Sequence, residues 1–192
     1  MLVIGNGESR KTINLDSLTT TKIGCNAIYR DNNVEHLVCV DKPMFKEVLD
    51  SNYNDFAKIH TRSTIHDSYL NTKNVRTLPS LPYVGMERPD LSENWGSGPY
   101  AVLLAATMSQ NISLIGFDLY SKTNTVNNIY KGTKNYIAAE KSPIDPSYWI
   151  YQIGKIFDNY PKVKFTIFQE EGWQRPKAWK KSNVKVDNLT NI

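Results

Sequence analysis

The chain has 192 residues, of which 40% are hydrophobic and 22% are charged, and its formal net charge is +4 at pH 7. These values are ordinary for a soluble globular protein, and so small a charge gives little attraction for nucleic acid. No apolar stretch approaches the length that crosses a bilayer, and the N-terminus lacks a basic region followed by an apolar one. We therefore expect one domain, a cytoplasmic location and no nucleic-acid partner.

The first predicted strand, Leu2–Ile4, ends in the turn Gly5-Asn6-Gly7, with Ser9 close behind. Glycine has no Cβ, so such a turn can take unusual backbone angles and a ligand can approach it closely. Backbone amides exposed at a turn of this kind can bind a phosphate. An isolated Gly-x-Gly is also found in plain tight turns after strands, so the motif needs support from the rest of the chain.

Strand and helix signals alternate after this turn. Further strands are predicted at Lys22–Cys25, His36–Val40, Ala57–His60, Val75–Leu78, Asn111–Phe117 and Val163–Phe168, the last of the sheet. Helices are predicted from Pro43 to Leu49, from an N-cap at Ser97 to Met108, and from Asp145-Pro146 to Tyr160. This alternation predicts an α/β fold, with a mostly parallel sheet covered by helices on both faces.

Polar residues gather where several of these strands end. They are Gly5-Asn6-Gly7, Asn26, Asp41 and Asp118, and the helix that opens at Ser97-Gly98 can point the same way. Ligands of parallel sheets bind beyond the carboxyl ends of the strands, so these residues predict one common site.

The chain is interpreted as a single nucleotide-binding domain at 1–174 followed by a basic tail at 175–192. A polar segment at about 121–145 has no clear period and is predicted to be a lid over the site. In the tail, Trp179 is expected to pack on the domain, and weak contact with an anionic membrane surface is the alternative. Cys25 and Cys39 lack metal-ligand spacing and are expected to be buried free thiols.

The sequence lacks the motifs of several classes of nucleotide-binding protein. A nicotinamide fingerprint needs glycine where Arg10 stands and an acidic residue where Asn26 stands. No Gly-Lys-Ser/Thr follows the first glycines, no Asp-x-Asp pair is present, and no nucleophile elbow occurs. What remains is a pocket of amides, hydroxyls and phenols that suits a nucleotide held without metal ligands.

Four short blocks carry a family resemblance over most of residues 1–160. They are Gly5-Asn6-Gly7-Glu8-Ser9, Cys25-Asn26-Ala27-Ile28-Tyr29, Gly96-Ser97-Gly98 and Leu114-Ile115-Gly116-Phe117-Asp118-Leu119-Tyr120. In this order they resemble the bacterial lipooligosaccharide sialyltransferases of glycosyltransferase family 42. They are also similar to a wider group that includes flagellin-glycosylation accessory factors and archaeal pterin pyrophosphokinases. The resemblance implies a Rossmann-like domain with a small lid, a CMP-sugar donor and no cofactor or metal.

The resemblance also implies roles for single residues. Gly5, Asn6 and Gly7, with Ser9 in the same block, would hold the nucleotide phosphate. Asn26 and Ser97 would contact the nucleotide sugar and base, and Gly98 and Asp118, from two of the other blocks, are also expected to bind the nucleotide. Asp41 stands where the family has an asparagine that contacts the donor. Tyr120 and Tyr130 would stabilise the departing phosphate. Tyr136 would take the place of Tyr130 if the alignment of the lid is shifted. For both tyrosines the alternative to a catalytic role is packing on the surface of a polar loop.

The acceptor half of the site departs from the family pattern. The family has a histidine base before its late helix, where this chain reads Ile144-Asp145-Pro146. Asp145 could act as the base if burial raised its pKa, and helix capping is its alternative role. His60 and His66 flank a loop that could reach the pocket.

The leading interpretation is a sialyltransferase-like glycosyltransferase that moves an acidic sugar from a CMP donor to a glycan or other hydroxyl acceptor. The alternatives are pyrophosphokinase-like phosphoryl transfer, with Asp41 and Asp118 on Mg²⁺, and a non-catalytic nucleotide-binding module. The sequence leaves open whether the chain forms homo-oligomers.

Overall fold

A single sheet of eight strands organises the computed structural model, which describes residues 1–192. Its strands are β1 (Leu2–Ile4), β2 (Lys22–Cys25), β3 (His36–Val38), β4 (Lys58–Thr61), β5 (Val75–Thr77), β6 (Asn111–Ile115), β7 (Lys164–Gln169) and β8 (Val184–Asn188). Their order is β5-β4-β3-β2-β1-β6-β7-β8, and every neighbouring pair is parallel. This confirms the expected α/β, Rossmann-like fold.

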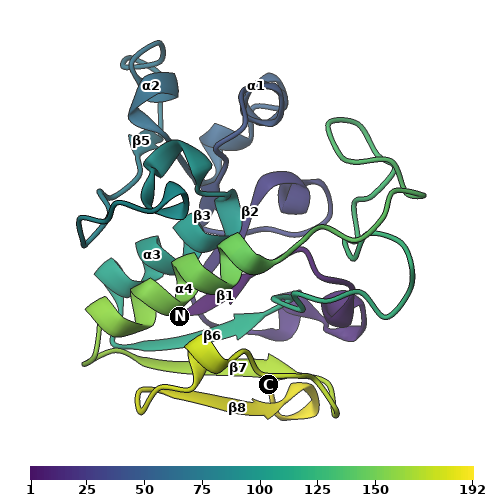
Figure 1. The fold of residues 1–192 in the computed structure, drawn as a ribbon. Helices are drawn as coiled ribbons and strands as arrows, with labels where there is room; N and C mark the ends of the chain where they lie inside the picture. Colours follow the sequence, from purple (N-terminus) through teal and green to yellow (C-terminus); the bar gives the residue numbers. More distant parts are fainter.

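Helices cover both faces of the sheet. They are α1 (Lys42–Asp50), α2 (Ser63–His66), α3 (Ser97–Met108) and α4 (Ser147–Asn159). α3 and α4 pack side by side on one face, whereas α1 and short 3-10 turns cover the other (Figure 1). Successive strand residues point to opposite faces, so Val3 joins the core under α3 and α4 while Leu2 and Ile4 join the core under α1.

The strand order reverses between β1 and β6. From β1 the sheet grows outward to β5, and the chain then returns through α3 to add β6 on the other side of β1. The backbone links the two loops that leave this point: the Gly5 N–H donates to the Ile115 oxygen at 2.8 Å and the Gly7 N–H to the Gly116 oxygen at 2.9 Å. Ligands of doubly wound sheets bind in the crevice that opens beyond such a reversal.

The helix α3 runs over β1, β2 and β3 and is buried nearly all round, as its apolar sequence predicts. Its bounds match the prediction, but Ser97 is its first residue rather than its N-cap, which is Gly96. The Ser97 hydroxyl instead accepts a hydrogen bond from the Val40 N–H at 3.2 Å.

Part of the expected tail, Val184–Asn188, forms strand β8, so the prediction that the sheet ends at Phe168 was wrong. β8 pairs with β7 from Phe165↔Val184 onward. The Arg175 guanidinium donates to the backbone oxygens of Trp179 and Val184, so this basic residue ties the segment together. Trp179 is fully buried, as expected. The short helix α2 was also missed, since its sequence is polar.

None of the helices combines the length and the apolar composition that crossing a membrane requires. Cys25 and Cys39 are buried free thiols, as expected. Segment 121–145, green in Figure 1, lies beyond the carboxyl ends of the central strands.

Candidate functional site

A cavity of about 370 Å³ opens at the strand-order reversal, in the size range of small-molecule sites. Its walls come from the loops after β1, β2, β3 and β6, from the first turns of α1 and α3, from α4 and from segment 121–145. The lining residues are Gly5, Asn6, Gly7, Cys25, Asn26, Asp41, Met44, Gly96, Ser97, Gly98, Pro99, Gly116, Phe117, Asp118, Leu119, Asn127, Asn128, Asn135, Tyr136, Ile137, Ile144, Trp149 and Ile153.

The two glycines after β1 allow the loops to touch. A Cβ on Gly5 would lie 2.3 Å from the Gly116 oxygen, and one on Gly7 would lie 2.4 Å from the carboxyl carbon of Asp118. Both glycine amides already donate to backbone oxygens. The Asn6 N–H between them donates to no protein acceptor, so it is the amide of this turn that is left for a ligand.

The side chain of Asn6 joins the turn to the lid. Its amide nitrogen donates to the Cys25 oxygen at 3.2 Å and to the Tyr136 hydroxyl at 3.0 Å. Its side-chain oxygen is buried and has no partner. A buried acceptor without a partner costs free energy, so a hydrogen-bond donor on a ligand would be stabilised here.

The Tyr136 hydroxyl accepts a second bond, from the Ala27 N–H at 3.3 Å. Burial raises the pKa of this phenol above its ordinary value, so the hydroxyl stays protonated at neutral pH. With its lone pairs engaged by two N–H donors, Tyr136 has its own proton to offer to a ligand in the cavity.

Asn26 and Ser97 meet as the sequence predicted. The Ser97 hydroxyl donates to the Asn26 side-chain oxygen at 2.7 Å. Asn26 has a left-handed backbone (φ 55°) at the end of β2, a conformation that asparagine tolerates. Gly98 follows in the first turn of α3, where backbone amides lack partners within the helix.

Leu119 also has a left-handed backbone, with φ 65°. This conformation is strained for a bulky side chain and persists only where surrounding structure enforces it. Gly116, with φ 68°, begins the same loop after β6. Strained residues on the wall of a cavity are typical of functional sites.

Asp118 and Asp41 are the two carboxylates of the wall. Ser9 holds Asp118 through its N–H at 2.9 Å and through its hydroxyl. Ser9 therefore lies behind the wall, where it orients a site residue. No three His, Cys, Asp or Glu side chains of the structure come together as metal ligands do.

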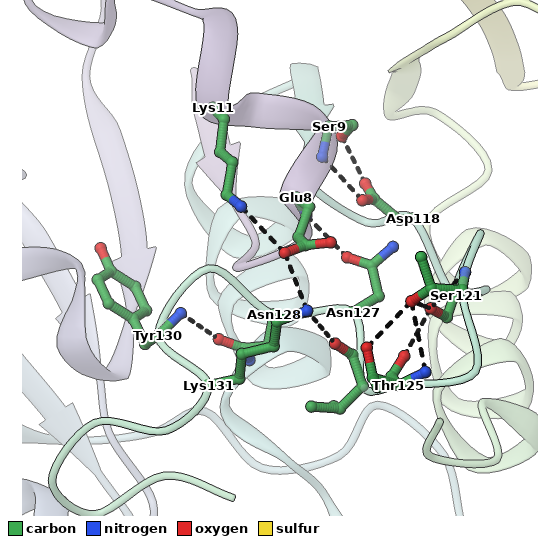
Figure 2. A network of polar contacts seen from close by, with 12 residues as sticks. Glu8, Ser9, Lys11, Asp118, Ser121, Thr125, Asn127, Asn128, Tyr130 and Lys131 are labelled. Atoms are coloured by element: carbon green, nitrogen blue, oxygen red, sulfur yellow. Dashed lines mark hydrogen bonds and ion pairs between the residues drawn. The ribbon is translucent and has the colours of Figure 1, made fainter. Parts of the chain in front are cut away.

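Polar contacts fasten the lid to the turn after β1 (Figure 2). The Asn127 side-chain oxygen accepts from the Glu8 N–H at 2.7 Å, and the Glu8 carboxylate pairs with Lys11 at 3.0 Å and with Lys131 at 3.2 Å. The Ile129 N–H donates to the backbone oxygen of Asn6 at 2.9 Å. The first half of segment 121–145 is therefore anchored, and Asn127 and Asn128 are held at the cavity.

Tyr130 is buried beside the cavity without lining it. Its hydroxyl donates to the Asp31 carboxylate at 2.5 Å and accepts from the Arg10 guanidinium at 2.9 Å, and the Arg10 Nε donates to the Gly5 oxygen at 2.8 Å. Burial and the Asp31 carboxylate raise the pKa of Tyr130. Tyr130 is therefore held inside the protein rather than packed on its surface, and its substitute Tyr136 lines the cavity.

Tyr120 and Asp145 also lie off the cavity wall. Tyr120 is 41% exposed. Asp145 is exposed and accepts from both the N–H and the hydroxyl of Ser147 at 2.9 Å, and these bonds lower its pKa. A lowered pKa makes a weaker base, so Asp145 serves the start of α4, which was the alternative role.

No histidine lines the cavity. His36 and His60 form a buried pair between β3 and β4, with Nδ1 of the former 2.9 Å from Nε2 of the latter. His66, at the other end of the loop that follows His60, does not line the cavity either.

Sequence reasoning missed several wall residues. They are Asn127, Asn128, Asn135, Ile137, Ile144, Trp149 and Ile153. The asparagine clusters of the lid were a usable signal, because lid residues of that type offer both donors and acceptors. Trp149 and Ile153 belong to the apolar stripe of α4, which the sequence predicts to be part of the hydrophobic core. The local sequence does not distinguish the end of this stripe that lines the cavity from the end that is buried in the core.

The geometry thus defines an α/β protein with an amide-rich cavity at its strand-order reversal. Models of known protein families, curated proteins and solved structures were all compared with this chain, and none of them matches it.

Proposed function

We propose that the cavity binds a CMP-linked acidic sugar and that the protein is a metal-independent, sialyltransferase-like glycosyltransferase. The resemblance of the four sequence blocks to glycosyltransferase family 42 motivates this choice. Support comes from the position of Asn6, Asn26 and Ser97 on one cavity wall.

The observation that carries the proposal is the kind of donor on the wall. Besides apolar side chains and the carboxylates of Asp41 and Asp118, the cavity wall offers side-chain amides, the Ser97 hydroxyl and one buried phenol, and it has no lysine or arginine. A phosphodiester, as in a CMP-sugar, has a single negative charge. Neutral N–H and O–H donors suit one charge, whereas a pyrophosphate with its higher charge calls for cationic side chains or metal ions.

In this proposal Tyr136 takes the part of the phenol at the leaving phosphate. Its proton would be directed to the oxygen on which charge develops as the sugar–phosphate bond breaks, where a donor is worth most. The Asn6 N–H and the first turn of α3 would hold the phosphate. The lid asparagines offer donors for the sugar carboxylate, and Asp41 and Asp118 are the wall groups able to accept a proton from the acceptor.

A thermal-shift panel tests the nucleotide. CMP and a CMP-sugar should raise the melting temperature more than adenosine, guanosine or uridine nucleotides, because a ligand that binds only the folded state stabilises it. The shift should be the same with Mg²⁺ and with EDTA. No shift with any cytidine compound would contradict the proposal, and a shift that needs Mg²⁺ would favour the pyrophosphokinase-like alternative.

A non-catalytic nucleotide-binding module is the second candidate, favoured by the position of all three histidines outside the cavity. The two candidates differ in turnover. Binding of CMP-sialic acid without release of CMP, in the presence of a panel of glycan acceptors, would favour the module.

A further inference from the structure

A second cavity, of about 340 Å³, lies beside the first, between the loops that follow β6 and β7. Asp118 and Asn127 line both cavities, so the two spaces are neighbours. The second cavity therefore also opens beyond the carboxyl ends of parallel strands, where sheets of this type bind ligands.

Two aromatic side chains line this second cavity. The Trp173 indole N–H donates to the Asp118 backbone oxygen at 2.8 Å, and the ring packs against Trp179 with centroids 6.0 Å apart. Tyr120 is 41% exposed and its hydroxyl has no protein partner. One fixed ring and one accessible ring thus border the same space.

Gln169 brings an unpaired acceptor to this cavity. The residue is only 3% exposed, and its amide nitrogen donates to the Phe117 oxygen at 2.8 Å. Its side-chain oxygen accepts no hydrogen bond from the protein. Because the protein supplies no donor to it, this oxygen can accept a hydrogen bond from a hydroxyl or N–H group of a ligand.

The charges of the second cavity indicate which kind of ligand it can bind. Glu170 pairs with Lys122, which neutralises both groups. Glu171 lines the cavity and makes no ion pair. With an uncompensated carboxylate and an unpaired amide oxygen, the cavity favours a neutral ligand rich in hydroxyl groups and disfavours an anion.

We propose that this second cavity binds a neutral pyranose. The C–H face of the sugar would pack against Tyr120 and Trp173, and its hydroxyls would donate to Gln169 and Glu171. Sites of this composition, aromatic with a few placed polar groups, are typical of small-molecule binding. That this sugar is the acceptor end of a glycan rests on the proposed function, whereas its binding does not.

Saturation-transfer NMR on the full chain tests the proposal. The probes are the methyl glycosides of galactose, glucose, mannose and N-acetylglucosamine, with N-acetylneuraminic acid as the anionic comparison. At least one neutral glycoside should give ring-proton signals, and the anion should give weaker ones. Tyr120→Ala should weaken the affinity about three- to tenfold, since an aromatic contact of this kind is lost.

Phe56→Ala is the matched control, because Phe56 is an exposed ring (82%) that lines neither cavity. It should leave sugar binding unchanged. No signal from any neutral glycoside, or equal affinity of Tyr120→Ala and the parent, would overturn the proposal. CMP binding is measured on the same samples: sugar binding without CMP binding would refute the proposed function alone, and CMP binding without sugar binding would refute the second cavity alone.

Discussion

The side-chain amide of Asn6 donates a hydrogen bond to the Tyr136 hydroxyl at 3.0 Å, across 130 residues of sequence. This contact joins the turn after the first strand to the lid, and both residues line the cavity. It brings together the most informative motif of the sequence and a tyrosine that the motif analysis kept only as a substitute.

Tyr136→Phe should weaken CMP binding at least about fivefold, because the phenol proton is lost from the cavity wall. The free energy of unfolding should fall by about 1 kcal/mol, since Asn6 and Ala27 lose their common acceptor. Isothermal titration with CMP and chemical denaturation measure the two effects.

Tyr130→Phe is the matched control for that variant. Its hydroxyl binds Asp31 and Arg10 away from the cavity, so we expect a loss of about 1–3 kcal/mol in stability with little change in CMP affinity. A large loss of CMP affinity in Tyr130→Phe with an unchanged affinity in Tyr136→Phe would reverse our assignment of the two tyrosines.

Asn6→Ala should raise the Kd for CMP several-fold while the protein stays folded. The variant removes the side-chain oxygen that has no protein partner and frees Tyr136 from the amide that orients it. Asn54→Ala is the control, since it also removes an amide bonded to a backbone oxygen, that of Lys73 at 3.1 Å, but outside the cavity. Equal affinity of Asn6→Ala and Asn54→Ala would contradict the assigned role.

Gly5→Ala should lower the free energy of unfolding by about 1–3 kcal/mol or more. Its Cβ would lie 2.3 Å from the Gly116 backbone oxygen, which a hydrogen bond from Gly7 holds in place. Gly98→Ala is expected to keep the parent stability, because the nearest atom to its Cβ would be a Phe117 ring carbon at 3.6 Å. Denaturant unfolding of the two variants compares them, and equal stability would mean that the loops separate easily.

Stability should fall as the pH drops from about 6.5 toward 4. Burial, followed by the neighbouring His36, lowers the pKa of His60 from 6.5 to about 4, and burial also lowers that of His36. The unfolded chain then binds more protons than the folded one in this range, so acid favours unfolding, by about 3 kcal/mol for His60 alone.

His60→Gln should flatten this pH dependence, which denaturant titrations at pH 7, 6, 5 and 4 would measure. His36→Gln tests the same pair from its other side. An unchanged slope in both variants would show that other groups cause the loss.

Much of the fold could be predicted because it depends on local pattern. Short apolar runs and the all-apolar Ser97–Met108 stretch mark their elements without knowledge of the partner, and α3 has the predicted bounds. β8 escaped prediction because Val184 is its single buried residue, so the strand is recognisable only by its pairing with β7.

The site was predictable only in part. Asn26, Asp41, Ser97 and Asp118 could be placed at the cavity because the carboxyl ends of parallel strands share one edge. The lid has no period, so its sequence did not distinguish Tyr136, which reaches the cavity, from Tyr130, which turns toward Arg10.

By itself, then, the sequence determined which residues begin and end the central elements, since hydrophobic period and glycine position act locally. The tertiary structure decided which polar groups remain without partners. The amides of Gly5 and Gly7 are taken by neighbouring backbone oxygens, whereas the N–H of Asn6 and the side-chain oxygen of Gln169 are left unpaired. That difference depends on what other segments bring within hydrogen-bond distance, which no local pattern records.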